Sequence, residues 1–336
     1  MHHLTTEMLP AIQAELKAVL CAEIHPPVDH LHGMMQYHMG WLDEQFEPLE
    51  SNAGKQIRPL LCLLACHAAG GDWRQALPAA AAVELLHNFS LIHDDIEDNS
   101  PTRRGRATSW RIWGVPLATN AGDAMFSVAH LALNRLVERG VSADITVRAL
   151  RRFDETCLAL TQGQQADMLF ESRTEVSVEE YVAMITGKTS VLLALCAELG
   201  ALIAGVGEET AADYSAFGLN LGLAFQVQDD ILGIWGDEAV IGKSATSDIE
   251  TRKKTLPVLY GLAHNPALRE LYAQVEHGSD FVPRVVALLD ESGARPYAEN
   301  RARQYSQAAL DHLHTAAPRH PTPLEALTEM LLARKA

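Results

Sequence analysis

An apolar helix that ends in a cluster of acids constrains this chain more than any other feature. The mostly apolar run from Ala79 to Ile92 contains no Gly or Pro, which predicts a buried helix. Four acids follow within five positions, at Asp94, Asp95, Glu97 and Asp98. Residues four apart share a helix face, so Asp94 and Asp98 should point the same way, with Asp95 about 100° round the helix. Like charges this close repel, so we expect a positive partner.

The sequence that follows indicates what the partner is. Mg²⁺ typically takes one or two protein carboxylates together with substrate phosphates. Arg103 and Arg104 come after a Ser-Pro-Thr turn, and arginine forks suit phosphate oxygens. The pattern favours a metal-bridged polyphosphate site. A solvated acidic helix end followed by a basic loop would look the same, so the other motifs decide.

A second helix that ends in acidic residues supports the interpretation of the first as part of a metal–diphosphate site. The apolar segment Ala216 to Val227 leads into Asp229 and Asp230, and a loop with Lys243 and the basic run 252–254 follow. Two apolar helices therefore each end in paired aspartates, and each precedes basic residues. Such a pair could bind one metal–diphosphate cluster from both sides.

Other basic and polar residues fit the same chemistry. Lys55 and Arg58 lie three apart at a predicted helix start, where they could hold an anion. The Gly-Lys-Thr at 187–189 is weak alone because the upstream glycine of a P-loop is missing. Gln164 and Asp167 share the face of an apolar helix and need polar partners. The joint occurrence of these residues makes a merely solvated acidic surface improbable.

Periodicity and length predict the fold class. Apolar residues recur at helical spacing almost throughout the 336 residues, and we find no convincing strand segment, repeat or linker. We therefore expect one all-α domain over residues 1–336. Residues 1 to about 50 should form two helices broken at Pro26 and Pro27. The histidines at 25, 30, 32 and 38 are interpreted as surface or interface residues rather than metal ligands.

Composition excludes several partners. Lys and Arg number 27 against 43 Asp and Glu, a net charge of −16, which argues against nucleic acid. Five cysteines without a Cys-x-x-Cys indicate reduced thiols and a cytoplasmic location. No signal peptide is evident at the start of the sequence. The apolar stretch 191–206 is short and contains Glu198, so we expect a core helix rather than a membrane span.

Together these motifs resemble the trans-isoprenyl diphosphate synthase (polyprenyl synthetase) family from about Gly54 to Tyr260. Residues 94–98 resemble the first aspartate-rich motif, and Asp229 with Asp230 the start of the second. The resemblance implies an antiparallel helical bundle around a deep central cavity, usually as a homodimer. It also implies a reaction, in which isopentenyl diphosphate is joined to an allylic diphosphate (dimethylallyl, geranyl or farnesyl).

The resemblance further implies a role for each matching residue. The principal ligands of Mg²⁺, with three ions expected per site, would be Asp94, Asp98 and Asp229, supported by Asp95 and Asp230. Four cations would hold the allylic diphosphate with the metals: Arg103, Lys188, Lys243 and Lys253. Four residues would bind the diphosphate of isopentenyl diphosphate: Lys55, Arg58, His87 and Arg104. Near the reacting carbons would lie Gln226, Thr189 and Gln164.

Product length is expected to depend on residues just before the first motif. In the family, an aromatic five positions before the motif forms a floor under the growing chain, and a second one four before closes the cavity higher. Phe89 supplies the first, whereas Ser90 leaves the second position open. This pattern resembles C20-forming members, which predicts geranylgeranyl diphosphate, with farnesyl diphosphate as the alternative. Met125 or Phe126 could also supply the floor.

Three positions depart from the family pattern. The third aspartate of the second motif is replaced by Gly233. Asp237 would lie about 12 Å from Asp229 along a straight helix, too far to substitute simply. Ser244 stands where proline is common, and Arg252 where glycine is common. We expect activity with altered binding of one metal. Two other functions stay open: a class I terpene cyclase and a non-catalytic partner subunit of a synthase. A scaffold without a ligand is a third and more remote reading.

Overall fold

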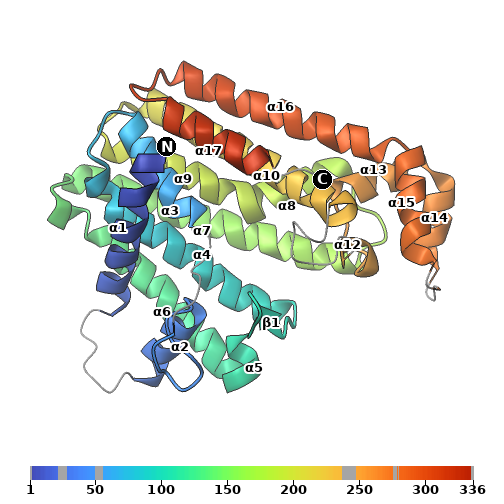
Figure 1. The fold of residues 1–336 in the computed structure, drawn as a ribbon, viewed down its shortest axis with the longest axis horizontal. Helices are drawn as coiled ribbons and strands as arrows, with labels where there is room; N and C mark the ends of the chain where they lie inside the picture. The colour runs from blue at the N-terminus through green and yellow to red at the C-terminus, as the bar shows by residue number, and fades with distance from the viewer. Residues whose placement is uncertain are drawn as a thin grey trace. The chain divides into compact units, whose positions relative to one another are not determined.

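The computed structural model describes residues 2–21, 29–49, 56–236, 247–274, 278 and 280–333. The predicted all-α class is confirmed, because helices account for most of these residues (Figure 1). Strands in these ranges are limited to an antiparallel pair, in which Thr102 is paired with Ala107 and Arg103 with Arg106. Two helices, separated by residues outside the described ranges, fill the N-terminal region as expected.

The chain divides into two compact units. Unit 1 contains Met1–Asp154, Leu195–Ala211 and Pro318–Pro323, and unit 2 contains Glu155–Ala194, Ala212–Ala317 and Leu324–Ala336. The single domain expected over residues 1–336 stays a prediction.

The elements of unit 1 are α1 (His2–Leu20), α2 (His30–His38), α3 (Ile57–Ala68), η1 (Trp73–Ala76), α4 (Leu77–Glu97), β1 (Thr102–Arg103), β2 (Arg106–Ala107), α5 (Ser109–Trp113), α6 (Val115–Asn134) and η2 (Val137–Arg139). Residues of both units occur in α7 (Ala143–Ser172), α9 (Val191–Ile203), α10 (Glu208–Trp235) and α17 (Thr322–Leu332). The remaining elements of unit 2 are α8 (Val178–Ile185), η3 (Thr186–Ser190), α12 (Ser247–Glu250), α13 (Leu256–His264), α14 (Pro266–Ala273), α15 (Phe281–Glu291) and α16 (Ala294–Thr315).

Helix α4 forms the centre of unit 1. It contacts α6, α3 and α1, and it is buried without interruption from Leu77 to Leu86. Four consecutive alanines at 79–82 leave little side-chain bulk, so neighbouring helices can pack on several sides. The helix emerges toward solvent only in its last turns, where the acids begin. The apolar run therefore fixes in place the end that carries Asp94 and Asp98.

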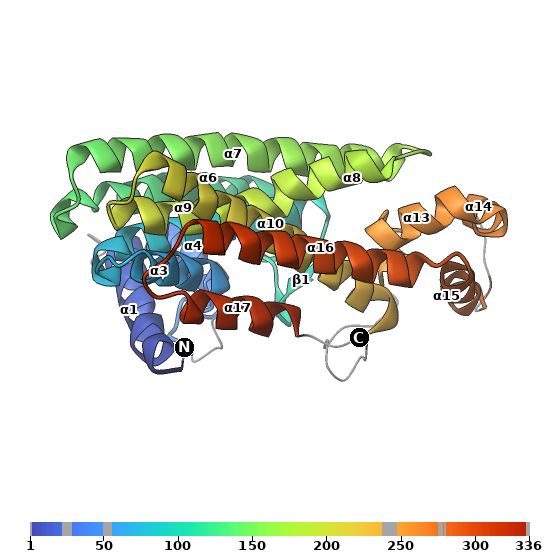
Figure 2. The same cartoon turned by 90° about the horizontal axis from the view of Figure 1, so that it is seen from above.

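Helix α10 plays the corresponding part in unit 2. Leu223, Val227 and Ile231 enter one apolar cluster with Tyr181 of α8 and residues of α13 and α16. Ile234, one turn later, enters a second cluster formed with α12 to α15. In Figure 2, α13, α14 and α15 group together, in agreement with their contacts. The end of α10 that carries Asp229 is therefore held on two apolar faces.

In the part of the chain that the structure describes, one helical stretch, Val178–Ile203, is long and apolar enough to cross a membrane by length and composition alone. Within the apolar 18-residue segment of this stretch, 61% is buried inside the protein. Burial of this extent is what the core helix of a soluble protein shows. The sequence interpretation of residues 191–206 as a core helix agrees with this finding.

Candidate active site

The three aspartates at the end of α4 have different surroundings. Asp98 is exposed and caps the helix, and its amide donates to the Asp94 carbonyl at 2.8 Å. Asp94 is partly exposed, whereas Asp95 is only 2% exposed. The Nε and one terminal nitrogen of Arg103 both donate to Oδ1 of Asp95 at 2.8 Å. Burial raises the pKa of Asp95, and Arg103 opposes this shift. Asp95 is therefore turned into the protein, where it holds Arg103, and Asp94 and Asp98 are the more exposed aspartates of this helix end.

A tight hairpin positions the arginines. Arg104 (φ 52°) and Gly105 (φ 76°) form the turn between β1 and β2, and left-handed conformations at both turn residues match the right-handed twist of a hairpin. Arg106 fixes the second strand, because its guanidinium donates to the carbonyls of Tyr37 at 3.0 Å and Leu42 at 2.8 Å. It also lies over the Tyr37 ring, 3.9 Å from the centroid.

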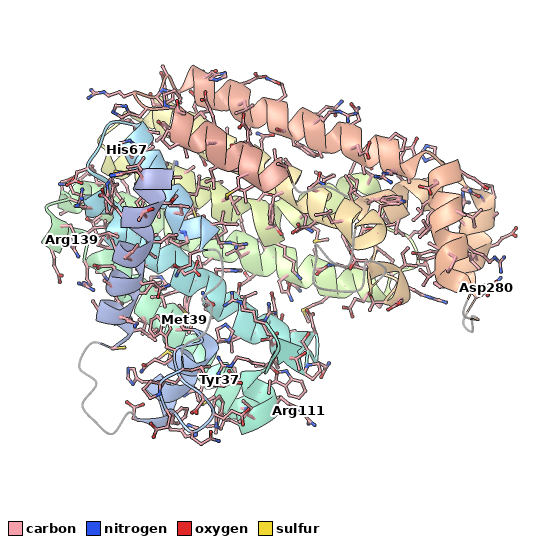
Figure 3. The ribbon with its side chains drawn as sticks, viewed as in Figure 1. Tyr37, Met39, His67, Arg111, Arg139 and Asp280 are labelled. Carbon is pink, nitrogen blue, oxygen red and sulfur yellow. The ribbon has the colours of Figure 1, made fainter. Side chains whose placement is uncertain are left out.

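A small cavity of about 150 Å³ opens between this hairpin and the end of α2. Its charged walls are three arginines and one carboxylate, so it suits an anion. Figure 3 marks Tyr37 and Met39, which lie on its α2 side. The residues around it are Tyr37, His38, Met39, Gly40, Asp95, Arg103, Arg104, Arg106, Ala107, Thr108 and Ser109.

His38 belongs to this cavity, although the sequence analysis placed it with the surface or interface histidines. Burial and the neighbouring arginines Arg103, Arg104 and Arg106 lower the pKa of His38 to about 3, so its ring is neutral. Its Nε2 and the hydroxyl of Ser109 are buried without a hydrogen-bond partner among the described residues. Sequence alone did not distinguish His38 from the other histidines nearby, at 25, 30 and 32.

Another cation, Arg58, lies where α3 begins. The terminal nitrogen of Arg58 is 3.2 Å from Nε2 of His87, and burial with the nearby arginines lowers the pKa of His87 well below 6.5. Because a guanidinium only donates, Nε2 of His87 must accept this bond. His87 therefore orients Arg58 through Nε2. The diphosphate contact expected for His87 stays a prediction. Lys55 lies outside the described residues.

Lys188 lies in the π-helical segment η3, and backbone contact between η3 and α7 sets its position. A Cβ added to Gly163 would fall on the Lys188 amide and lie 2.8 Å from the Lys188 Cα, so only glycine permits this approach. The Lys188 ammonium reaches Oδ2 of Asp167, one turn on from Gly163, at 2.5 Å. Single π turns inside helices often occur at functional sites. Gln164 and Asp167 on α7 were expected to need polar partners, and Lys188 is the partner of Asp167.

The second aspartate pair repeats the division seen in the first. Asp229 is partly exposed, whereas Asp230 is 2% exposed. The Tyr181 hydroxyl donates to Asp230 at 2.5 Å, and the Leu256 amide at 3.1 Å. Gln226 donates to the other oxygen at 3.2 Å. Burial raises the pKa of Asp230 to about 6, and these bonds oppose the shift. Asp230 is a structural anchor, and Asp229 is the more exposed member of the pair.

Asp230 also fixes residues that were predicted to lie near the reacting carbons. Gln226 receives a hydrogen bond from the Thr189 hydroxyl at 3.0 Å, so Thr189, Gln226 and Asp230 form one chain. Tyr181, which the sequence analysis missed, closes the chain from α8. Its pKa is raised well above 10 by burial and then by Asp230, with smaller effects from Asp167 and Asp248. An apolar position in an amphipathic helix gave no sign of this contact.

The three residues of the basic run 252–254 make different contacts. Arg252 has φ 54°, a left-handed conformation that explains why glycine is common at this position. Its guanidinium donates to the carbonyls of Tyr272 and Gln274. Lys254 is anchored, because its ammonium donates to the Phe170 carbonyl at 2.5 Å. Lys253 is exposed and lowers the pKa of Asp230 by its charge. Lys243 and Ser244 lie outside the described residues.

The predicted chain-length residues lie in an aromatic stack within unit 1. The Phe89 ring is 5.0 Å from the Phe126 ring and 4.8 Å from His93. Phe126 in turn lies 6.5 Å from the buried Phe153. Ser90 points its hydroxyl to the His87 carbonyl at 2.8 Å and adds no bulk. The alternative floor residue Phe126 is therefore a direct neighbour of Phe89.

The carboxylates fit a hard divalent cation that binds together with its substrate. Among the residues that the structure describes, no three His, Cys, Asp or Glu side chains converge into a complete metal site. Mg²⁺ does not need one, because it is usually bound by one or two carboxylates plus phosphate oxygens and water. Asp94 and Asp98 at the end of α4 carry carboxylates on partly or fully exposed side chains, and so does Asp229 near the end of α10. At each helix end this chemistry suits Mg²⁺ bound together with a diphosphate.

The sequence pattern of the polyprenyl synthetase family matches residues 39–289. The chain belongs to the polyprenyl synthetase family. It is similar to the (2E,6E)-farnesyl diphosphate synthase of Mycobacterium tuberculosis, with 43% identity over 84% of this chain and 79% of the relative. It is also similar to the geranylgeranyl diphosphate synthase of that organism, with 40% identity over 98% and 93%. The structure matches that of a polyprenyl synthase from Caulobacter crescentus complexed with calcium and isoprenyl diphosphate, at 27% identity and a TM-score of 0.81 over 99% and 97%.

Membership confirms the predicted family, fold class and enzyme class. The polyprenyl synthetase described here is a prenyltransferase, because its relatives are prenyl diphosphate synthases, which transfer prenyl groups. Both a farnesyl and a geranylgeranyl synthase are near relatives, so the comparisons leave the product length undecided between C15 and C20.

Proposed function

We propose that the enzyme joins isopentenyl diphosphate to an allylic diphosphate in a Mg²⁺-dependent reaction and releases mainly geranylgeranyl diphosphate. The observation that carries this proposal is the repeated division of the aspartate pairs. At each helix end, one member is buried as an anchor (Asp95, Asp230) and the other is partly exposed (Asp94, Asp229). A merely solvated acidic surface would not bury the second aspartate of each pair. This division supports a built ligand site at both helix ends.

The metal assignment follows from the exposed members. Asp94, Asp98 and Asp229 would hold Mg²⁺, with three ions expected as in the family. Bound Mg²⁺ would supply positive charge that stabilises the diphosphate as it leaves. The calcium and isoprenyl diphosphate in the Caulobacter crescentus structure support a shared metal–diphosphate chemistry.

The allylic diphosphate would be held by Arg103, Lys188, Lys243 and Lys253. Two of these cations are already oriented by a carboxylate, Arg103 by Asp95 and Lys188 by Asp167. Orientation before binding lowers the entropy that a flexible side chain loses when the substrate arrives. The carboxylate partners therefore support the binding role of these two cations.

The diphosphate of isopentenyl diphosphate would be held by Lys55, Arg58, His87 and Arg104, and His87 also orients Arg58. The arginine-lined cavity beside Arg104 supports an anion at this end of unit 1. Both His87 and His38 are neutral there, so they add hydrogen-bonding capacity without repelling the arginines.

The reaction then follows from charge and exclusion of water. The allylic C–O bond breaks, and its electron pair leaves with the diphosphate, whose charge the basic side chains stabilise. The double bond of isopentenyl diphosphate attacks the allylic carbon, a C–C bond forms, and a proton is lost from the adjacent carbon to the released diphosphate. The carbocation survives only where water is excluded. Gln226 and Thr189, fixed by Asp230, would line the reacting carbons.

Product length would be set by the aromatic stack. Phe89 backed by Phe126 would stop the chain, and the small Ser90 would leave room above for a C20 product. Farnesyl diphosphate is the second candidate, favoured by the similarity to the farnesyl synthase.

We also propose a cytoplasmic homodimer. Large apolar side chains are exposed on α6 and α7, with Leu131 at 60%, Val147 at 65% and Leu158 at 61%. A second copy of the chain would cover such residues. None of the five cysteines, all within the described residues, forms a disulfide. Sedimentation of the purified enzyme should show a dimer, and a monomer at micromolar concentration would contradict this assembly.

The test of the proposed function is product analysis. Radiolabelled isopentenyl diphosphate is incubated with Mg²⁺ and dimethylallyl, geranyl or farnesyl diphosphate, and products are separated by chain length. A synthase extends all three primers, mainly to C20. Release of hydrocarbon from the primer alone would indicate a terpene cyclase. Inactivity with every primer would favour a non-catalytic partner subunit.

A further inference from the structure

The side chain of Arg252 binds the carboxyl end of α14. Its guanidinium donates to the carbonyls of Tyr272 at 3.3 Å and of Gln274, and it lies over the Phe281 ring, 5.4 Å from the centroid. The last carbonyls of a helix carry partial negative charge, so a cation is favoured there. Arg252 makes these contacts from a left-handed backbone (φ 54°), which few residues other than glycine adopt. The contacts give a physical reason for an arginine at a position where glycine is common.

The side chain of Lys254 binds the carboxyl end of α7 in the same way. Its ammonium donates to the Phe170 carbonyl at 2.5 Å and lies 3.5 Å from the Glu171 carbonyl, both in the last turn of that helix. Burial lowers the pKa of this ammonium below its usual value, because the contact withdraws it from water. The two neighbours of Lys253 are therefore attached to two different helix ends, one on each side of it.

Lys253 is held by its backbone, whereas its side chain is exposed. Its amide donates to the Asp248 carbonyl at 2.8 Å, and its carbonyl accepts the Thr255 amide at 3.0 Å. Burial raises the pKa of Asp230 to about 6, and the charge of Lys253 is among the effects that oppose this shift. Lys253 thus brings its charge to the second aspartate pair from a turn of fixed geometry.

We propose that Arg252 and Lys254 are positioning residues, which fix the turn that presents Lys253 to the allylic diphosphate. Neither side chain touches the substrate. Each holds the backbone of the turn, so that the Lys253 ammonium is oriented before the diphosphate arrives and loses less entropy on binding. The role of Lys253 rests on the proposed function, whereas the fixing of the turn does not.

Hydrogen exchange tests the fixing of the turn without turnover. Exchange of the Lys253 amide is followed by mass spectrometry of peptides that cover residues 249–256 in the full-length enzyme. Arg252→Gly, in which the new residue suits the left-handed backbone, and Lys254→Ala should each exchange about tenfold faster or more, because the turn opens more often. Lys254→Arg keeps a donor at the end of α7 and should stay close to the wild type.

The matched control removes the same kind of contact elsewhere. Arg269 donates to the carbonyls of Leu262 at 3.1 Å and Ala263 at 3.4 Å, at the end of α13 away from Lys253. Arg269→Ala should therefore leave the exchange of residues 249–256 unchanged. Wild-type exchange in both Arg252→Gly and Lys254→Ala would overturn the proposal.

Substrate kinetics test whether the two residues act through Lys253. Lys254→Ala should raise the KM for geranyl diphosphate about threefold to tenfold, a part of the effect of losing the Lys253 contact itself, and should leave the KM for isopentenyl diphosphate unchanged. In a Lys253→Ala background the same substitution should have no further effect, because the side chain to be positioned is gone. An undiminished effect in that background, or equal KM increases for both substrates, would overturn the proposal. An inactive wild type would refute the proposed function, and the exchange rates would still decide whether Arg252 and Lys254 fix the turn.

Discussion

Removing the Phe89 ring should lengthen the product. Phe89→Ala deletes the ring that we propose as the stop, and the next ring in the stack, Phe126, lies 5.0 Å behind it by centroids. The vacated space is similar in size to one C5 unit. We therefore expect the main product to grow by one unit, after which Phe126 becomes the new stop. The double variant Phe89→Ala/Phe126→Ala should allow at least one further unit.

The energy available is large enough to change the main product. Burying five carbons is worth at most about 4 kcal/mol, at about 0.8 kcal/mol per methylene. Reversing a product ratio from about 9:1 to about 1:9 requires about 2.6 kcal/mol, at about 1.4 kcal/mol per factor of ten. Even two thirds of the burial energy would reverse the distribution. A partial shift would mean that the cavity collapses after the ring is removed.

The assay is the chain-length analysis of products from geranyl diphosphate and radiolabelled isopentenyl diphosphate. Ser90→Phe should shorten the product toward C15, because it places a ring one position nearer the acids. Phe46→Ala, which removes a ring packed against Trp113 and His30, is the matched control and should leave product length unchanged. Unchanged products in Phe89→Ala, in the double variant and in Ser90→Phe would show that the floor lies elsewhere.

Three further predictions follow from the two diphosphate sites and the buried groups. Arg58→Ala should raise the KM for isopentenyl diphosphate about tenfold to a hundredfold, and Lys188→Ala should do so for the allylic primer, since each loses a charge-assisted bond of about 1.5–3 kcal/mol; equal effects on both substrates would refute the assignment. The pKa of His38 is about 3 in the folded protein, against 6.5 as the ordinary value, so the unfolded chain takes up this proton first as pH falls. The folding stability that is present above pH 6.5 is therefore lost as pH falls below 6.5. His38→Gln should therefore flatten the urea-denaturation stability between pH 7 and pH 5, where the wild type should lose about 2 kcal/mol through this group; an unchanged slope would contradict it. Tyr181→Phe removes a donor from the buried Asp230 and should cost about 1–3 kcal/mol of unfolding free energy, with kcat reduced through Gln226; a variant as stable and active as wild type would exclude an anchoring role.

The fold class and the main acids could be predicted from sequence because both rest on local pattern. Helical periodicity in the Ala79 run, and acids one turn apart at its end, need no tertiary information. The family resemblance then assigned Arg103 and Lys188 to a diphosphate and Gln226 to the reacting carbons. These functional roles stay predictions.

Contacts between distant segments could not be predicted in the same way. The bond from Tyr181 to Asp230 joins residues 49 apart, and the packing of Asp248 against Gly233 depends on where α12 lies. Neither pair has a periodic signal in the sequence. His38 was missed for the opposite reason, because several nearby histidines offered no basis for choosing one. Pairings set by tertiary packing require the structure.

Metal dependence of the joining reaction tests the central claim most directly. The rate of isopentenyl diphosphate incorporation is measured against Mg²⁺ concentration for the wild type, Asp94→Ala and the exposed control Asp311→Ala on α16. The account predicts no turnover in excess chelator, full recovery on adding Mg²⁺, and a loss of several orders of magnitude in Asp94→Ala with unchanged helix content. Asp311→Ala should match the wild type. Substantial product in excess chelator, or near-normal turnover in Asp94→Ala, would contradict the claim that the acidic helix ends bind the metal used with the diphosphate.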